Sequence, residues 1–329
     1  MPKAPTDRRG GPSGSLGNPP TDGRLDISVV IPAYKGASTI VDCLESLKRA
    51  TAGRRLEIIV VESSNDPTAE IVRQRFPGVV LIQSAERLTA GGARNRGAGE
   101  ARGHLIFFTD QDCIVPPDWI DRLEHHLEDP SVGAAGGAVG IRNPANLSGC
   151  AVYFLEFLHH FPRSGAPQRD ENFLVGCNSA YRASALRAAR FPDQTLGEDV
   201  LLSHELRGNG FSVIYDPRVE VRHHNREGWR EFFNYNRKMG RSAASYHQVL
   251  QRWWVQPFFR FPFLVFLAPA VILPSIALAL ARSRRSYFFR FVLLSPMCLL
   301  GNLTWANAFR RQVLEMRASA PAHPDTSSA

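Results

Sequence analysis

The chain has 329 residues and a formal net charge of +8, from 39 basic and 31 acidic residues. This length suits one large α/β domain with an appendage, or two modest domains. The five cysteines, Cys43, Cys113, Cys150, Cys177 and Cys298, are odd in number and show no Cys-x-x-Cys spacing. They argue against a disulfide framework and against a zinc site, and they indicate a reducing environment for most of the chain.

The excess of positive charge suits three kinds of partner: nucleic acid, an anionic membrane surface or an anionic substrate. The sequence contains no helix-turn-helix, zinc-finger or RNP pattern, and its basic residues are dispersed, so we expect no nucleic-acid partner. Arginine strongly outnumbers lysine. This bias suits phosphate binding through a bidentate fork, although a GC-rich genome produces it as well.

The two ends of the chain differ from its middle. Residues 1–25 are rich in Pro, Gly, Asp and Arg and lack the apolar segment of a signal peptide. We predict a disordered tail there and a second one over residues 312–329. Between them we predict a catalytic domain over 26–236, a basic and aromatic linker helix over 237–257, and two hydrophobic helices within 258–311.

Short apolar runs alternate with amphipathic segments in the first part of the catalytic domain. Residues 27–31 are mostly β-branched and end at Pro32, as expected of a buried strand. The same patterns predict further strands over 56–61, 79–83 and 105–109, and helices over 38–50, 68–76 and 91–102. Such βαβ units imply an α/β fold with helices covering a parallel sheet, and ligands at the carboxyl ends of its strands.

The second part of the catalytic domain has a less regular pattern. It contains a Gly-rich stretch over 133–140, a predicted helix over 147–160 and a predicted loop over 163–172. A short aromatic helix is predicted over 229–235, directly before the linker. No internal repeat is visible in the sequence.

Two uncharged stretches, residues 261–281 and 291–309, follow the linker. Each is close to the roughly 20 residues that span a bilayer. The arginines between them would lie outside the cell if both segments crossed the membrane, against the positive-inside bias. A re-entrant or interfacial hairpin, or two buried core helices, therefore remain alternatives to two crossings. We expect a cell-membrane location with the catalytic domain facing the cytoplasm.

Asp110 and Asp112 follow the predicted strand 105–109 directly, with Gln111 between them. Two carboxylates at this spacing can face one ligand, and Mg²⁺ or Mn²⁺ is commonly held by one or two carboxylates together with substrate phosphates. Solvent-facing turn acids are the alternative. Because apolar residues flank the pair on both sides, and burying unpaired acids is costly, the metal interpretation is favoured.

Several motifs occur in the order and spacing that are typical of one enzyme family. They are Val30-Ile31-Pro32-Ala33-Tyr34, Val60-Val61-Glu62-Ser63-Ser64-Asn65-Asp66, Gly92-Ala93-Arg94-Asn95-Arg96-Gly97, Phe108-Thr109-Asp110-Gln111-Asp112, Gly176-Cys177-Asn178-Ser179-Ala180-Tyr181-Arg182 and Leu196-Gly197-Glu198-Asp199. Over residues 26–236 the chain resembles the family 2 glycosyltransferases, which have the GT-A fold, a Rossmann-like mixed sheet flanked by helices.

The resemblance implies roles for individual residues. The residues implied to line the nucleotide pocket are Pro32, Tyr34, Glu62 and Asp66. The residues implied near the diphosphate or sugar are Arg94 and Asn95, with Arg237 and Arg241 helping to close over the diphosphate. Asp110 and Asp112 would contact the ribose and the metal, Mn²⁺ or Mg²⁺. Glu198-Asp199 matches an acidic pair in which one carboxylate is the catalytic base, and we choose Asp199, with Glu198 as the alternate.

The chemistry of sugar transfer also calls for such a base. A positioned carboxylate that removes the proton of the acceptor hydroxyl contributes about 10²- to 10⁴-fold to the rate, and a divalent cation with nearby arginines can stabilise the leaving diphosphate. The product would have inverted stereochemistry. The alternative for Glu198-Asp199 is an acidic pair at a helix N-terminus, favoured by the helix dipole.

The sequence thus predicts a metal-dependent, inverting hexosyltransferase. It would move a sugar from a nucleotide-sugar donor, with UDP favoured and GDP and dTDP open, to a lipid-linked, polysaccharide or peptide acceptor at the membrane. A catalytically inert member of the same fold, which binds sugar nucleotides or acts as a scaffold, is the alternative. The adjacent histidine pairs, His159-His160 and His223-His224, are interpreted as structural or substrate-lining rather than metal-binding.

Overall fold

The computed structural model describes residues 25–170, 173–193 and 197–319. Apart from Leu25, which is buried, the predicted N-terminal tail lies outside the described residues. The same holds for residues 320–329 of the predicted C-terminal tail, for part of the predicted loop 163–172, and for Leu196 of the last motif.

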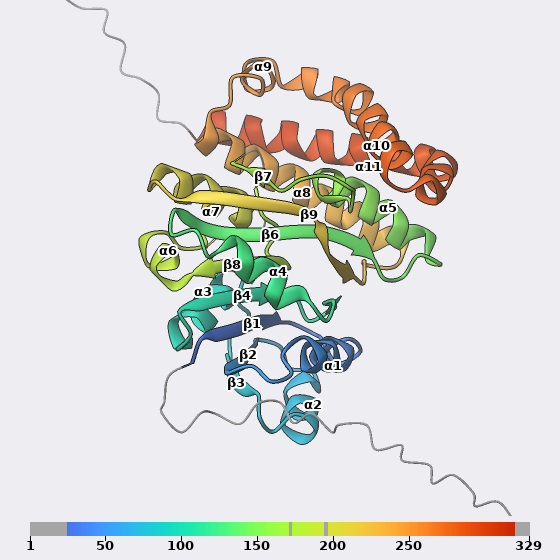
Figure 1. Ribbon diagram of the computed structural model, residues 1–329. Helices are drawn as coiled ribbons and strands as arrows, with labels where there is room; N and C mark the ends of the chain where they lie inside the picture. The colour runs from blue at the N-terminus through green and yellow to red at the C-terminus, as the bar shows by residue number, and fades with distance from the viewer. Residues whose placement is uncertain (1–24, 171–172, 194–196, 320–329) are drawn as a thin grey trace, which may run out of the picture.

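The described strands form one mixed sheet, in the order β3-β2-β1-β4-β8-β6-β9-β5 with β7 on β9. The strands are β1 Ile27–Ala33, β2 Leu56–Glu62, β3 Val80–Gln83, β4 Leu105–Thr109, β5 Cys113–Ile114, β6 Val132–Ile141, β7 Gln168–Arg169, β8 Asn178–Arg182 and β9 Ser212–His223. The first four pair in parallel, as predicted, whereas β8 runs antiparallel to both β4 and β6. This is the predicted mixed α/β architecture (Figure 1).

Helices cover both faces of the sheet. They are α1 Ile40–Ala50, α2 Thr68–Arg75, α3 Ala90–Glu100, α4 Trp119–His126, α5 Leu147–Glu156, α6 Ala183–Ala188, α7 Glu198–Gly208, α8 Trp229–Leu250, α9 Gln256–Arg260, α10 Pro269–Ser283 and α11 Arg285–Ala318, with 3₁₀ turns at Leu158–His160 and Pro262–Leu267. Val29 and Val30 point to opposite faces, because strand side chains alternate, and each joins a different hydrophobic cluster. Burial on both faces explains why the strands read as continuous apolar runs.

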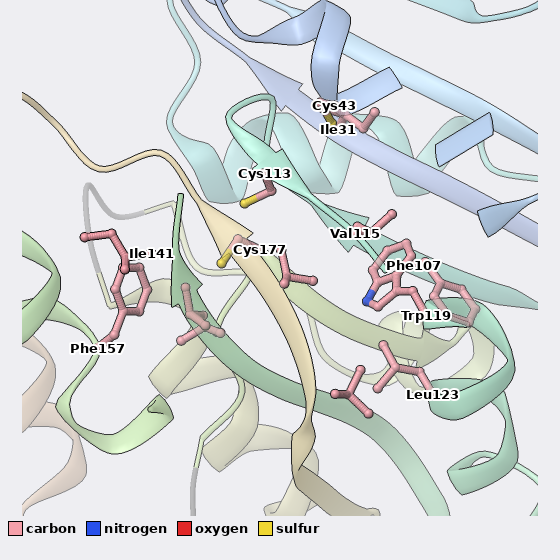
Figure 2. Packing of buried hydrophobic residues seen from close by; sticks show 14 of the residues in the cluster. Ile31, Cys43, Phe107, Cys113, Val115, Trp119, Leu123, Ile141, Phe157 and Cys177 are labelled. Carbon is pink, nitrogen blue, oxygen red and sulfur yellow. The ribbon is translucent and has the colours of Figure 1, made fainter. Parts of the chain in front are cut away.

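One cluster contains α1, α4 and α5. There the ring of Phe107 packs edge-on against Trp119, with centroids 5.3 Å apart. In the same cluster the side chains of Cys113 and Cys177 lie next to each other (Figure 2). The described cysteines are all free and buried, in agreement with the prediction that no disulfide framework exists. The other cluster contains α3, α6 and α7.

The Gly-rich stretch 133–140 is the long strand β6, which is buried throughout. Sequence reasoning predicted no strand there, because glycine is a poor strand former. Glycine occurs there because the backbones of neighbouring strands approach β6 closely. A Cβ on Gly136 would lie 2.7 Å from the carbonyl oxygen of Asn178, and a Cβ on Gly137 would lie 2.2 Å from the carbonyl oxygen of Val219.

The C-terminal helices differ from the predicted boundaries. Helix α8 runs without interruption from Trp229 to Leu250, so the boundary predicted between 236 and 237 falls inside a helix. Helix α11 continues to Ala318, into the predicted tail. Gly301 of α11 packs against Phe232, and Gly240 of α8 packs against Trp305. Helix α11 therefore lies along α8, with α10 outside it (Figure 1).

Two C-terminal segments, Pro262–Ser283 and Arg285–Ala318, are long and apolar enough to cross a membrane by length and composition. Only 22% and 28% of their most apolar windows are buried. Large apolar side chains on the outside of this layer are correspondingly exposed, among them Phe263, Leu267, Val271, Phe289 and Leu293.

Candidate active site

The loop Asp110-Gln111-Asp112 joins β4 to β5 at the carboxyl end of β4, and its backbone is fixed on both sides. The Cys43 thiol of α1 donates to the Asp110 carbonyl oxygen at 3.3 Å. The His224 backbone N–H donates to the Asp112 carbonyl oxygen at 3.0 Å. The two carboxylates are partly exposed, so they are rigidly placed and still open to a ligand.

The middle residue of the loop, Gln111, ties it to the end of β1. Its Oε1 accepts from the Tyr34 backbone N–H and its Nε2 donates to the Tyr34 carbonyl oxygen, each at 2.9 Å. A Cβ on Gly36 would lie 2.1 Å from Gln111 Oε1, so this close contact requires glycine at 36. The Tyr34 ring is exposed on one side and packs 4.3 Å from the Arg87 guanidinium.

The loop after β2 presents the two acids predicted for the nucleotide pocket. Glu62 is buried and its Oε1 accepts from the Ser64 backbone N–H at 2.5 Å. Asp66 accepts from Ser64 Oγ at 2.8 Å and from the Ala37 backbone N–H at 3.3 Å. Partial burial would raise the pKa of Asp66, but hydrogen bonds from Thr68 and Ser64 lower it. Asp66 thus stays ionised and joins the loops after β1 and β2.

A single buried guanidinium connects the metal-binding motif to the acidic pair. Arg94 of α3 donates from Nη2 to Asp110 Oδ1 and from Nη1 to Glu198 Oε1, each at 2.8 Å. Burial alone would lower the pKa of Arg94, but the carboxylates of Asp110 and Glu198 raise it. Gly176 makes room for this arrangement, since a Cβ there would lie 2.3 Å from Arg94 Cζ.

Asp199 stands beside this ion-pair cluster without a cationic partner in contact. Its carboxylate accepts only backbone N–H groups among the described contacts, from Val200 at 2.9 Å and from Gly176 at 3.4 Å. Burial and the neighbouring charge of Glu198 raise the pKa of Asp199 to about 7. A carboxylate with this pKa can accept a proton near neutral pH. Glu198 is engaged by Arg94, so the structure favours Asp199 over Glu198 as a base.

The pairing of β5 with β9 brings His223 next to Asp112, because Cys113 is in register with His223. His223 Nε2 lies 3.4 Å from Asp112 Oδ1. His223 Nδ1 lies 3.1 Å from Asn225 Oδ1, so Nδ1–H donates to that amide oxygen, and an Nε2 without a proton would be an acceptor. Two acceptors that face each other at this distance require a cation or a proton between them.

The residues around this pair fit a divalent cation. Ligand atoms of Asp112, Cys113 and His223 lie within 4.8 Å of one another. Burial raises the pKa of the Cys113 thiol well above its usual value, so the neutral thiol is a poor ligand and the donors are a carboxylate and an imidazole. A ligating histidine usually donates its other N–H to an outer partner, as His223 does to Asn225. His223 is therefore a candidate metal ligand, beside the structural or substrate-lining role that we predicted for it.

Arg226 is a second residue that sequence reasoning missed. Its guanidinium packs 4.2 Å from the Tyr235 ring, and its Nη1 lies 3.7 Å from Glu156 Oε2. Burial would lower the pKa of Arg226, but Tyr235, Glu156 and the two aspartates of the loop raise it. A basic residue three positions after a buried histidine gave no signal of its own, because only the fold brings its charge near Asp110 and Asp112.

Among the predicted substrate residues, three make their described contacts outside this cluster: Asn95, Arg237 and Arg241. The Asn95 amide donates to and accepts from the Phe191 backbone, at 2.7 Å and 3.1 Å, and so holds the segment that precedes α7. Arg237 donates to Asn234 at 3.0 Å, and Arg241 pairs with Glu315 of α11 at 2.7 Å. Pro32 lies within β1 opposite Val61, one residue before the strand ends.

Comparisons with known proteins identify relatives in sequence and in fold. Residues 28–189 match the family described as Glycosyl transferase family 2. The succinoglycan biosynthesis protein ExoO of Rhizobium meliloti is 36% identical over 64% of this chain and 64% of its own length. A poly-beta-1,6-N-acetyl-D-glucosamine synthase of Staphylococcus aureus is 24% identical over 58% of this chain and 48% of its own length. The chain thus spans less than two thirds of these relatives.

A similar fold occurs in a mannosyltransferase, PcManGT from Pyrobaculum calidifontis, whose structure was solved with GDP-Man and Mn²⁺. The TM-score is 0.54 and the identity 21%, over 90% of this chain and 86% of that one. At this identity the likeness shows the fold, and the fold is GT-A. The sequence match over residues 28–189 and the GT-A fold together identify a glycosyltransferase family 2 domain in this chain.

Proposed function

We propose that the chain is an inverting, divalent-metal-dependent hexosyltransferase that takes its sugar from a nucleotide-sugar. The observation that carries the proposal is the double ion pair of Arg94, which joins Asp110 of the metal-binding motif to Glu198, the neighbour of Asp199. One rigid cluster therefore holds the groups suited to a leaving diphosphate and the group suited to deprotonating an acceptor.

Asp112 and His223 would hold the cation, with Asp110 beside them. The cation would neutralise the charge that gathers on the leaving diphosphate. An imidazole ligand suits Mn²⁺ better than Mg²⁺, which prefers oxygen ligands and retained waters. Arg226 supplies a further positive charge on this side of the site. Mn²⁺ is therefore our choice between the two predicted ions.

Asp199 would accept the proton of the acceptor hydroxyl as that oxygen attacks the anomeric carbon. The bond from the anomeric carbon to the diphosphate oxygen breaks, and its electron pair leaves with the nucleoside diphosphate. Attack on the face opposite the leaving group inverts the anomeric configuration. Arg94 pairs with Glu198 at 2.8 Å, and the neighbouring Glu198 is one cause of the raised pKa of Asp199.

The donor nucleotide would contact Tyr34, Glu62 and Asp66 at the ends of β1 and β2. UDP is our choice for the nucleotide. The relatives named above are a succinoglycan biosynthesis protein and a poly-N-acetylglucosamine synthase, which supports a polysaccharide or its lipid-linked precursor as the acceptor. The chain would then act in the synthesis of cell-envelope polysaccharide.

Membrane contact is part of the proposal, with the catalytic domain on the cytoplasmic side. Helix α11 packs along α8, with Gly240 against Trp305 and Gly301 against Phe232. A helix held along the catalytic domain in this way is not free to cross a bilayer. We therefore propose the interfacial alternative, in which α10 and the outer face of α11 lie in the membrane surface.

A thermal-shift panel of UDP-, GDP- and dTDP-sugars, each with Mn²⁺ and with EDTA, tests the proposal. One nucleotide series should raise the unfolding midpoint only when Mn²⁺ is present, because a ligand that binds the native state stabilises it. That series should also be hydrolysed slowly without an acceptor. Binding without any hydrolysis or transfer would support the inert alternative, and an equal shift in EDTA would contradict the metal role.

A further inference from the structure

A cavity of about 550 Å³ lies in the groove between α8 and α11. Its lining combines guanidinium groups of Arg237, Arg241 and Arg311 with apolar side chains of Phe233, Leu300 and Leu303. None of these residues contacts Asp110, Asp112 or Asp199 among the described interactions. The groove is therefore a feature separate from the catalytic cluster.

The two helices run in the same direction, so the groove has an apolar end and a cationic end. Phe232 packs on Gly301, whereas Arg241 reaches Glu315 further along both helices. Phe233, Leu300 and Leu303 accordingly lie near the start of the groove, and Arg241 and Arg311 near its other end. This polarity matches an amphiphile with an anionic head.

The cationic end carries more positive than negative charge. Arg241 is paired with Glu315 at 2.7 Å. Arg237 donates to the neutral amide of Asn234, and no carboxylate in the described part of the chain pairs with Arg237 or Arg311. Both side chains are exposed. Two guanidinium groups are thus available to an anion from solution or from a membrane.

We propose that this groove binds the phosphate of an anionic membrane phospholipid, with Arg237 and Arg311 on the phosphate and an acyl chain along Leu300 and Leu303. Guanidinium groups bind phosphate oxygens in a bidentate manner. The exposed apolar side chains of α11, such as Leu293, lead along the same helix to the groove. The inference rests on the proposed membrane contact of α10 and α11 and not on the transfer reaction.

Vesicle flotation of the full-length protein tests this site. Vesicles of phosphatidylcholine alone are compared with vesicles that also contain phosphatidylglycerol. The double variant Arg237→Gln/Arg311→Gln should lose affinity for the mixed vesicles by about fivefold for each arginine removed, as expected for basic residues at an anionic surface. Arg237→Lys/Arg311→Lys should lose part of the affinity, because lysine keeps the charge but not the fork.

The matched control is Arg282→Gln/Arg285→Gln, which removes two exposed charges at the end of α10 and the start of α11, outside the groove. It should change the affinity by less than about twofold. Equal losses in the two glutamine pairs would show diffuse attraction and overturn the site. Vesicle binding that inorganic phosphate abolishes would show a site for free phosphate instead.

Nucleotide binding separates this inference from the proposed function. Arg311→Gln, at a residue with no predicted role at the donor, should keep the full midpoint shift with nucleotide-sugar and Mn²⁺. Loss of that shift with unchanged vesicle binding would assign this arginine to the donor and overturn the lipid site. Absence of any nucleotide shift in the unmodified protein would contradict the proposed function and leave the flotation result valid.

Discussion

His223 Nε2 lies 3.4 Å from Asp112 Oδ1, and the Nδ1 of the same ring faces Asn225 Oδ1 at 3.1 Å. The hydrogen bond to Asn225 orients the ring, so that Nε2 faces the Asp112 carboxylate with room for a cation or a proton between them. In the proposed metal site, this relationship adds a ligand that the Asp-Gln-Asp sequence does not contain. The adjacent histidine has different surroundings, since His224 is partly exposed and its Nε2 lies 3.4 Å from Glu227 Oε1.

Replacing His223 should therefore weaken metal binding. We expect His223→Ala to raise the dissociation constant for Mn²⁺ about 10- to 100-fold or more, because loss of even an outer-shell partner costs that much. Mn²⁺ binding can be followed by electron paramagnetic resonance or calorimetry with nucleoside diphosphate present. His224→Ala is the matched control and should bind Mn²⁺ as the unmodified protein does. Unchanged affinity in His223→Ala would remove His223 from the metal site.

Replacing Asp199 should slow transfer and leave donor binding intact. Asp199→Asn cannot accept the proton of the acceptor hydroxyl, so kcat should fall about 10²- to 10⁴-fold. The donor KM and the nucleotide-induced midpoint shift should stay within about twofold. Retention of full transfer to a true acceptor would show that Asp199 is not the base, and Glu198 would then be tested in its place.

The pH dependence of the rate should follow from the same group. A base works in its deprotonated form, and the pKa of Asp199 is raised to about 7. The rate should therefore be nearly constant above pH 8 and fall about tenfold per pH unit well below 7. A profile that stays flat down to pH 5, measured with saturating Mn²⁺, would contradict this assignment.

The ionised Asp199 carboxylate should also lower the free energy of unfolding at neutral pH. Its pKa is raised in the folded state above an ordinary value near 3.8. Its carboxyl group therefore favours folding below pH 4, and this contribution is lost as the pH rises through 7. Asp199→Asn should raise the unfolding midpoint most at pH 8 and least at pH 4. The opposite trend, in urea or heat, would show that the carboxylate is stabilised in the fold.

Gly176 should be essential for the position of Arg94. A methyl group there would lie 2.3 Å from Arg94 Cζ, and overpacking of this kind costs about 1–3 kcal/mol. Gly176→Ala should lower both the free energy of unfolding and the transfer rate. Gly99→Ala is the matched control, because Gly99 lies in α3 with nothing within 4 Å of an added Cβ. It should be neutral or stabilising.

The outer apolar side chains of α11 should carry the membrane contact. Phe289→Asp and Leu293→Asp place a charge on side chains that are 71% and 72% exposed. Each should reduce flotation with phosphatidylcholine vesicles several-fold, because inserting a charge into the apolar layer is costly. Val80→Asp, on the edge strand β3, is the control and should float normally. Unchanged flotation of the α11 variants would place the membrane contact elsewhere.

Local sequence patterns were sufficient for the first part of the fold. Buried β-branched runs and amphipathic segments determine β1 to β4 and α1 to α3 within a few residues, because each element buries its own apolar residues on a fixed period. The segment over 133–140 was not predicted as a strand, since glycine there serves contacts with Asn178 and Val219, which are remote in sequence. The helix boundaries near 236 and 311 were also missed, because packing of α8 against α11 extends both helices.

The sequence by itself determined that Asp110 and Asp112 follow a buried strand and that the acidic pair Glu198-Asp199 begins a helix. Only the tertiary structure decided which groups these acids meet. The register of β5 with β9 places His223 against Asp112, and the packing of α3 places Arg94 between Asp110 and Glu198. Contacts of this kind depend on strand pairing and helix packing between distant segments, which no local period encodes.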